Sequence, residues 1–104
     1  MAFSGYKFKD ADDIKPFCED GASGKTFEWC KAQAKKLGCW VFCGYPQVEE
    51  EKLYNSQMVV RPDGTYEKSY KKSFLYETDE TWASEGPGFE AMDLFLPRHN
   101  KSVR

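Results

Sequence analysis

The sequence of 104 residues lacks an excess of charge of either sign, because 15 lysines and arginines face 17 aspartates and glutamates, for a net charge of -2. A nearly neutral chain has no bulk attraction for phosphates, which excludes nucleic-acid binding through net charge. A long hydrophobic run is also missing. The longest uncharged stretch, residues 37–48, is well short of the roughly 20 apolar residues of a membrane-spanning helix. The opening residues show no secretory signal, so we expect a cytosolic protein with no membrane or nucleic-acid partner.

Patterns typical of metal sites and disulfides are absent as well. The chain has a single histidine, His99, and four cysteines whose spacings match no zinc motif. Cys39 and Cys43 fall in an apolar run that is typical of a strand, where their Cα atoms would be about 13 Å apart, beyond disulfide reach. We therefore expect no metal site, and reduced thiols at all four positions, the other two being Cys18 and Cys30.

The sequence does contain enough apolar material for a packed core. Hydrophobic residues make up 40% of the chain and aromatic residues 16%, which excludes a disordered tail. At this length a single domain is the expected number.

One amphipathic helix is predicted within residues 21–38. Ser23 or Thr26 is placed to cap its beginning, and Gly38 is placed to end it in the left-handed conformation. Charged and polar side chains fill one side of this helix. The other side carries apolar residues at helical spacing, which are Phe27, Cys30, Ala34 and Leu37.

Strands are predicted on the C-terminal side of the helix. Residues 39–45 are apolar on both alternating faces, which favours an interior strand covered on both sides over an edge strand. After a polar loop at 46–53, residues 54–61 predict a second strand. The Pro62-Asp63-Gly64 turn then joins it to a strand at 65–70 as a β-hairpin. A helix combined with such strands implies a layered α/β fold.

The rest of the chain is predicted to be mostly loop. Residues 1–20 indicate a loop with one helical turn near 10–14, and a short strand is expected at 92–96. Residues 71–89 are irregular. A long loop in a compact domain is usually functional, yet the charges at 70–80 alone are also typical of an ordinary solvated turn.

Three places in the chain together resemble the nitrilase or carbon-nitrogen hydrolase superfamily. The first is Gly44-Tyr-Pro46, followed by Tyr54-Asn-Ser56. The second is Tyr70-Lys-Lys-Ser-Phe-Leu75, which resembles the family motif Tyr-Arg-Lys-x-His-Leu with its catalytic lysine. The third is Glu80, eight residues past Lys72, where several family amidases carry a second active-site glutamate. The resemblance implies that Lys72 and Glu80 are catalytic and that the fold is part of an αββα sandwich.

Within the superfamily, the opening Met-Ala-Phe-Ser-Gly-Tyr-Lys-Phe and residues 72–82 resemble most the fungal-type N-terminal amidases. Those enzymes remove ammonia from the side chain of an N-terminal Asn or Gln. The resemblance therefore implies an amide substrate, possibly a protein N-terminus, and it implies no cofactor. It also implies possible homo-oligomers, because the sandwiches of this family pair.

The family mechanism needs three groups. A cysteine thiolate attacks the amide carbonyl, a glutamate moves protons, and a lysine stabilises the oxyanion on the way to a thioester. In the family, the general-base glutamate lies just before the segment that residues 1–6 resemble. The nucleophilic cysteine lies just after the segment that residues 100–104 resemble. Cys43 corresponds to an ordinary core position of the family. We therefore interpret residues 1–104 as a single partial domain truncated at both ends, and expect it to be inactive alone.

Two alternatives stay open. The chain could belong to an amidase or nitrilase of the same superfamily that acts on a small-molecule amide or nitrile. It could also be a non-catalytic truncated product that binds a homologous subunit. The pattern of residues does not separate these from the leading interpretation.

Overall fold

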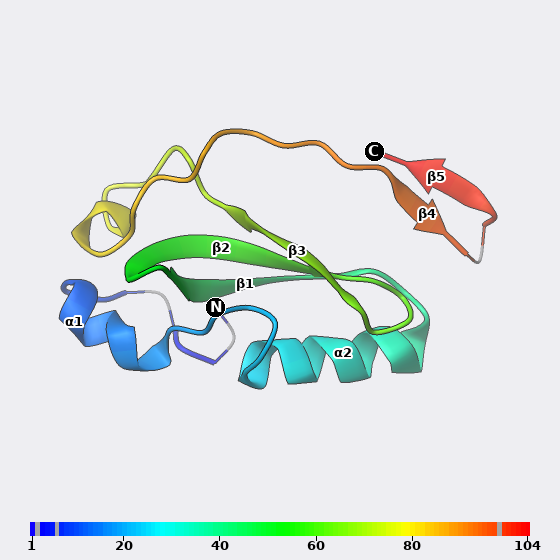
Figure 1. Cartoon of the computed structure of the whole chain (residues 1–104), viewed down its shortest axis with the longest axis horizontal. Coiled ribbons are helices and arrows are strands. Elements are labelled where there is room, and N and C mark those ends of the chain that lie inside the picture. Colours follow the sequence, from blue (N-terminus) through cyan, green and yellow to red (C-terminus); the bar gives the residue numbers. More distant parts are fainter. Residues whose placement is uncertain (2, 6, 98) are drawn as a thin grey trace.

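A three-stranded antiparallel sheet forms the centre of the computed structural model, which describes residues 1, 3–5, 7–97 and 99–104. Ala2 and Tyr6, which belong to the opening string used above, lie outside the described residues. The strands lie in the order β1-β2-β3, and the long helix α2 runs along one face of the sheet (Figure 1). These elements are β1 (Val41–Glu49), β2 (Lys52–Val60), β3 (Tyr66–Lys71) and α2 (Lys25–Leu37).

Short elements complete the chain, namely α1 (Ala11–Ile14), the 3₁₀ helices η1 (Lys15–Phe17) and η2 (Asp79–Thr81), β4 (Leu94–Leu96) and β5 (Lys101–Val103). The predicted helical turn near residues 10–14 is confirmed, and Asp10 Oδ1 accepts a hydrogen bond from Asp13 N over 3.0 Å. The strand expected at 92–96 is β4, which pairs with the unpredicted β5. None of the helices in the described residues has the length and apolar character to cross a bilayer.

The predicted amphipathic helix is confirmed as α2. It ends at Gly38, which has φ 62° and ψ 38° and donates its N–H to Ala34 O over 2.8 Å. A left-handed residue of this kind is a common helix terminator. The helix packs on the sheet through a buried cluster of Cys30, Ala34, Tyr45, Met58 and Val60. Leu37, predicted on the same apolar face, is 49% exposed, because it lies in the last turn of the helix.

The predicted capping residues of this helix are wrong. The residue before the first turn is Gly24, which has no side chain to cap with. The Ser23 hydroxyl contacts the Asp20 carboxylate instead. Glu19, seven residues before Thr26, accepts hydrogen bonds from the Thr26 N–H at 2.9 Å and from its hydroxyl at 2.5 Å. A carboxylate from outside the helix thus satisfies a free N–H of the first turn.

The prediction that the first strand is interior and covered on both sides is also wrong. Within the described residues, β1 lies at one edge of the sheet and pairs with β2 along its length; its outer side makes a short parallel bridge between Glu19 and Gln47. Pro46 fits this position, because a residue without an N–H is tolerated on the outer side of an edge strand. Phe42, on the face away from α2, is 45% exposed.

The polar loop expected at 46–53 does not exist as such. β1 continues to Glu49, which faces Lys52 across a two-residue turn. Both turn residues, Glu50 (φ 49°) and Glu51 (φ 68°), are left-handed. Turns of this hand match the twist of a hairpin, but they are usually marked by Asn or Gly. The predicted hairpin through Pro62-Asp63-Gly64 is confirmed.

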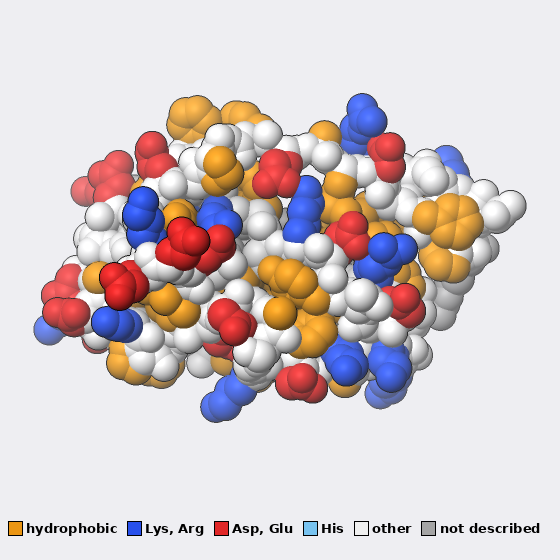
Figure 2. All heavy atoms as spheres, viewed as in Figure 1, with side chains coloured by type: hydrophobic (Ala, Val, Ile, Leu, Met, Phe, Trp, Pro, Cys, Tyr) orange, Lys and Arg blue, Asp and Glu red, His pale blue; other side chains and the backbone are white. Residues whose placement is uncertain are grey.

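The C-terminal segment crosses the face of the sheet opposite α2 (Figure 1). It is tied down by Ser84 N to Leu53 O at 2.7 Å and by Trp40 Nε1 to Phe95 O at 2.7 Å. Phe42 on this face stays 45% exposed. Figure 2, seen from the same side as Figure 1, shows hydrophobic side chains in several patches among charged ones.

Candidate active site

Lys72 lies at the end of the sheet, one residue after β3. Its backbone is held from two sides. Its N–H donates to Asn55 O over 2.9 Å, and its carbonyl accepts from Gly86 N over 2.9 Å. The position of this residue is therefore fixed by both β2 and the loop that follows.

The Lys72 side chain forms an ion pair with Asp79 at the start of η2. The distance from Nζ to Oδ2 is 2.7 Å. The Asp79 side chain is 1% exposed, whereas that of Lys72 is 38% exposed. The buried carboxylate is the fixed member of the pair, and the ammonium extends from it toward solvent.

Two further groups donate to the Asp79 carboxylate. Asn55 Nδ2 lies 3.2 Å from Oδ1, and Tyr76 N lies 3.1 Å from Oδ2. A buried carboxylate is stable only when it is paired and hydrogen-bonded. Lys72, Asn55 and Tyr76 meet this requirement together.

Lys71 points away from Lys72, as expected for neighbouring residues in extended backbone. Its Nζ lies 2.7 Å from Glu49 Oε2 and 5.3 Å from the ring centre of Tyr54. The hydrogen bond to Glu49 raises the pKa of Lys71 above its ordinary value. The two adjacent lysines thus have separate partners.

The structure does not bring Glu80 to Lys72. Glu80 is exposed, and its N–H donates to Tyr76 O over 3.2 Å. In the short 3₁₀ helix, consecutive side chains diverge, so Asp79 faces inward and Glu80 faces out. The residue that the sequence reasoning missed is Asp79. Within the charged stretch 70–80, no sequence signal separates the buried acid from the exposed one.

A cavity of about 370 Å³ opens beside Lys72. It is lined by Gly44, Asn55, Ser56, Gln57, Tyr70 and Lys72. Gly44, Gln57 and Tyr70 are direct cross-strand neighbours on β1, β2 and β3. The floor of the cavity is therefore the sheet itself, and Lys72 is one of the residues that line it.

The four cysteines are free thiols, as predicted. Burial raises the pKa of Cys30 to about 12 and that of Cys18 to about 11. A raised pKa disfavours the nucleophilic thiolate. Within the described residues, no group of three or more His, Cys, Asp or Glu side chains is arranged to hold a metal ion.

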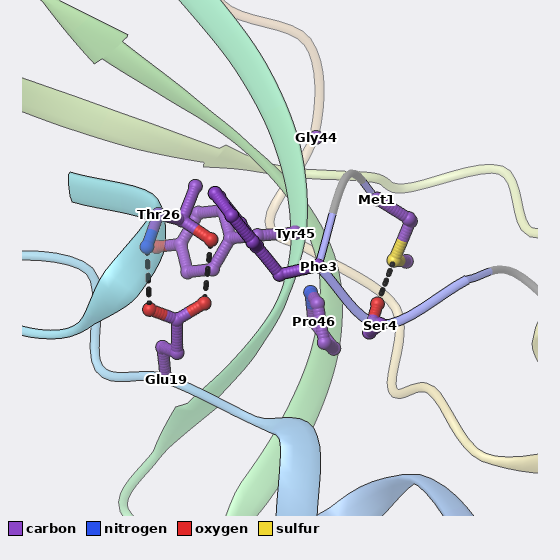
Figure 3. A pocket seen from close by; sticks show the side chains of 8 residues that line it. All are labelled: Met1, Phe3, Ser4, Glu19, Thr26, Gly44, Tyr45 and Pro46. Atoms are coloured by element: carbon purple, nitrogen blue, oxygen red, sulfur yellow. Dashed lines mark hydrogen bonds between the residues drawn. The ribbon is translucent and has the colours of Figure 1, made fainter. Parts of the chain in front are cut away.

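A second hollow, between the N-terminal residues and the start of α2 (Figure 3), has no room for a water molecule. Phe3 and Tyr45 project into it beside the hydrogen bonds from Thr26 to Glu19. Its role is structural, because side chains already fill it.

The family profile and the most similar relatives described below indicate the same family. The sequence profile described as carbon-nitrogen hydrolase matches residues 1–102. The protein N-terminal amidase of Saccharomyces cerevisiae is 38% identical over 97 residues, which cover 90% of this chain and 21% of that protein. The protein N-terminal amidase of Schizosaccharomyces pombe is 33% identical, over 86% of this chain and 33% of that protein. The chain thus spans a fifth to a third of the length of these relatives.

The fold has a counterpart among solved structures. A crystal structure of N-terminal amidase with an Asn-Glu-Ala peptide superposes with a TM-score of 0.86 at 37% identity, covering 90% of this chain and 23% of that one. Another structure of N-terminal amidase contains a Gln-Gly peptide. The similarity confirms the predicted fold class, a mixed α/β layered arrangement that is part of a nitrilase-type αββα sandwich.

Proposed function

The chain belongs to the carbon-nitrogen hydrolase family, and from this premise we propose that it supplies the lysine segment of an amidase that releases ammonia from an N-terminal Asn or Gln. The observation that carries the proposal is the position of Lys72. Lys72 lines an open cavity, and its ammonium is held by a buried carboxylate. The similarity to N-terminal amidases, including structures with Asn-Glu-Ala and Gln-Gly peptides, supports this substrate class.

In the proposed reaction, the role of Lys72 is electrostatic. When a nucleophile attacks the side-chain amide, negative charge develops on the carbonyl oxygen, and a preorganised cation stabilises it. The cavity beside Lys72 has room for a small amide side chain. Glu80 is proposed as a second active-site carboxylate by resemblance; a role for it requires that its exposed side chain turn toward the cavity.

By resemblance, no residue of this chain corresponds to the nucleophilic cysteine or to the general-base glutamate. We therefore expect the 104-residue chain alone to release no ammonia from Asn-Glu-Ala or Gln-Gly. A cation stabilises only a transition state that other groups allow to form. Ammonia release above a protein-free blank would contradict this expectation.

The test of the function uses a hybrid enzyme in which this chain replaces the matching segment of the S. cerevisiae amidase. We expect Lys72→Met to lower kcat with Asn-Glu-Ala peptide by about 100- to 1,000-fold, as the loss of one preorganised donor does. Lys72→Arg should also fail, because a planar guanidinium does not place its charge where a compact ammonium lies. Lys71→Met is the matched control and should change kcat little.

Substrate choice separates the proposal from its alternatives. A hybrid that hydrolyses small amides or nitriles but not peptides would favour a small-molecule amidase or nitrilase. A hybrid that is folded and inactive, together with binding of this chain to a full-length homologue, would favour a non-catalytic role. Full activity of the Lys72→Met variant would overturn the assignment of the lysine.

A further inference from the structure

We propose that Asp79 is a positioning residue that fixes the ammonium of Lys72 at the border of the active-site cavity. This inference rests on the function proposed for Lys72. Asp79 does not line the cavity, whereas Lys72 does. Asp79 therefore acts through the lysine and does not contact the substrate.

The contacts of Asp79 hold its carboxylate in a fixed position, and we call Asp79 the anchor of Lys72 for this reason. The carboxylate is 1% exposed and binds Lys72 Nζ at 2.7 Å, while Asn55 Nδ2 and Tyr76 N donate to it at 3.2 and 3.1 Å. These two donors come from β2 and from the loop before η2, so the carboxylate is held by two parts of the fold. It cannot follow the lysine if the lysine moves.

The backbone around Asp79 is equally well held. Its N–H donates to Tyr76 O over 2.9 Å, and its carbonyl accepts from Ala83 N over 2.8 Å. The lysine side chain, in contrast, has four rotatable bonds and lies at the surface. A flexible cation stabilises developing charge efficiently only if it is held in place before the reaction. The rigid, buried acid supplies that restraint.

An ion pair with a purely structural role would not need one buried and one partly exposed member, as Asp79 and Lys72 are. Lys68 with Glu90 and Lys71 with Glu49 are pairs in which both side chains are partly exposed. Such pairs contribute little to stability. The pair at Lys72 differs because its acid is fully buried and its lysine lines a cavity.

The first test labels amines in the 104-residue chain. Trinitrobenzenesulfonate is applied at one fixed pH, and the modification rate of each lysine is followed by mass spectrometry. An ammonium bound to a carboxylate reacts slowly, so we expect Asp79→Asn to raise the labelling rate of Lys72 by about fivefold or more. The rate at Lys71 should stay the same, because its partner Glu49 is untouched.

The matched control is Glu77→Gln, which makes the same chemical change at an exposed site two residues away. It should leave the labelling of Lys72 unchanged. If circular dichroism shows that Asp79→Asn is unfolded, Asn55→Ala replaces it. That variant removes one donor to the carboxylate and should raise the rate at Lys72 by a smaller factor. An unchanged rate at Lys72 in the folded variant would overturn the inference.

The second test is kinetic and uses the hybrid enzyme. Asp79→Asn should lower kcat by roughly tenfold and leave KM nearly unchanged, because the substrate does not contact the carboxylate. The double variant Asp79→Asn/Lys72→Met should be no slower than Lys72→Met alone, since both changes act on one cation. Glu77→Gln should keep the rate of the unmodified hybrid.

The outcomes separate the inference from the proposed function. If Lys72→Met retains full activity, the proposed function is wrong. Asp79 then has no role in catalysis, even if the labelling shows that it holds the Lys72 ammonium. If Lys72→Met is inactive but Asp79→Asn leaves kcat unchanged, only the role of Asp79 is overturned. A double variant much slower than Lys72→Met would show that Asp79 acts independently of the lysine, and would also overturn it.

Discussion

Gly86 brings the loop after η2 into contact with the backbone that carries the lysines. Its N–H donates to Lys72 O, and a Cβ built on it would lie 2.2 Å from Lys71 O. A methyl group cannot fit there unless one of the two backbones moves. We expect Gly86→Ala to lower the free energy of unfolding by about 1–3 kcal/mol in urea denaturation.

The control for Gly86 is Gly38→Asn. Gly38 has open space around it, and asparagine tolerates the left-handed conformation at the end of α2. Its effect should stay within about 0.5 kcal/mol. If both variants lower the free energy of unfolding equally, the close contact between Gly86 and the Lys71 backbone is not the reason for the loss of stability.

The thiols of the buried Cys30 and the half-buried Cys18 make the stability depend on pH in the alkaline range. Burial raises the pKa of Cys30 to about 12 and that of Cys18 to about 11, from an ordinary value of 9.0. The unfolded chain loses these protons near pH 9 and the folded chain only at higher pH. The stabilisation is therefore fully present below pH 9 and is lost as the pH rises from 9 toward 12.

This pH dependence is measured by urea denaturation in a reducing buffer at a series of pH values between neutral and strongly alkaline. We expect the free energy of unfolding to fall more steeply in the unmodified chain than in Cys30→Ala, which lacks one of the two thiols. Cys39→Ala, at the bend after α2, is the control and should keep the original slope. Parallel slopes for Cys30→Ala and the unmodified chain would contradict the prediction.

Glu19 links the start of helix α2 to the edge strand β1 by hydrogen bonds. Glu19 accepts from Thr26 at the start of the helix, and its backbone bonds Pro46 O at 3.0 Å and Val48 N at 2.9 Å on β1. We expect Glu19→Ala to lower the free energy of unfolding by about 1 kcal/mol, the usual effect of losing an N-terminal cap. Ser23→Ala should have almost no effect, because Ser23 contacts only the exposed Asp20. If Ser23→Ala lowers the free energy of unfolding more than Glu19→Ala does, Ser23 and not Glu19 caps the helix.

The elements that the sequence predicts well are those encoded by nearby residues. Helical spacing and Gly38 predict α2, and the Pro-Asp-Gly turn predicts the hairpin of β2 and β3. The Glu50-Glu51 turn is missed because two glutamates carry no turn signal. The cap by Glu19 and the anchor at Asp79 are missed because they depend on contacts across the fold. The resemblance to the family points to Lys72, whereas its ion pair with Asp79 is visible only in the structure.

The shape of the chain is more extended than its length predicts. The radius of gyration of the Cα atoms is 14.3 Å, whereas about 13 Å is expected for a compact domain of this size. The extents of 44 × 26 × 22 Å show the same elongation. The buried residues form two separate clusters, one under α2 and one around Ile14, Leu53 and Trp82. Among the described residues, the C-terminal segment is what crosses the sheet face opposite α2 (Figure 1).

Exposed aromatic residues on and around this open face predict association. Phe42 is 45% exposed, Phe74 72% and Phe89 80%, and the outer edge of β3 has no strand beside it within the described residues. Contiguous apolar surface and a free strand edge both favour pairing with other chains. We expect the 104-residue chain to bind a hydrophobic dye and to self-associate at micromolar concentration, as measured by fluorescence and analytical ultracentrifugation.

A surface substitution tests whether the aromatic face drives this association. Phe89→Ser on the crossing segment should weaken both dye binding and self-association, because it removes the most exposed of these rings. Phe17→Ser, at a 49% exposed ring beside α1 and distant in sequence from the face, is the control and should change neither. If both variants reduce association equally, the attraction is general hydrophobicity. If the unmodified chain is a monodisperse monomer that binds no dye, the open face is not an association surface.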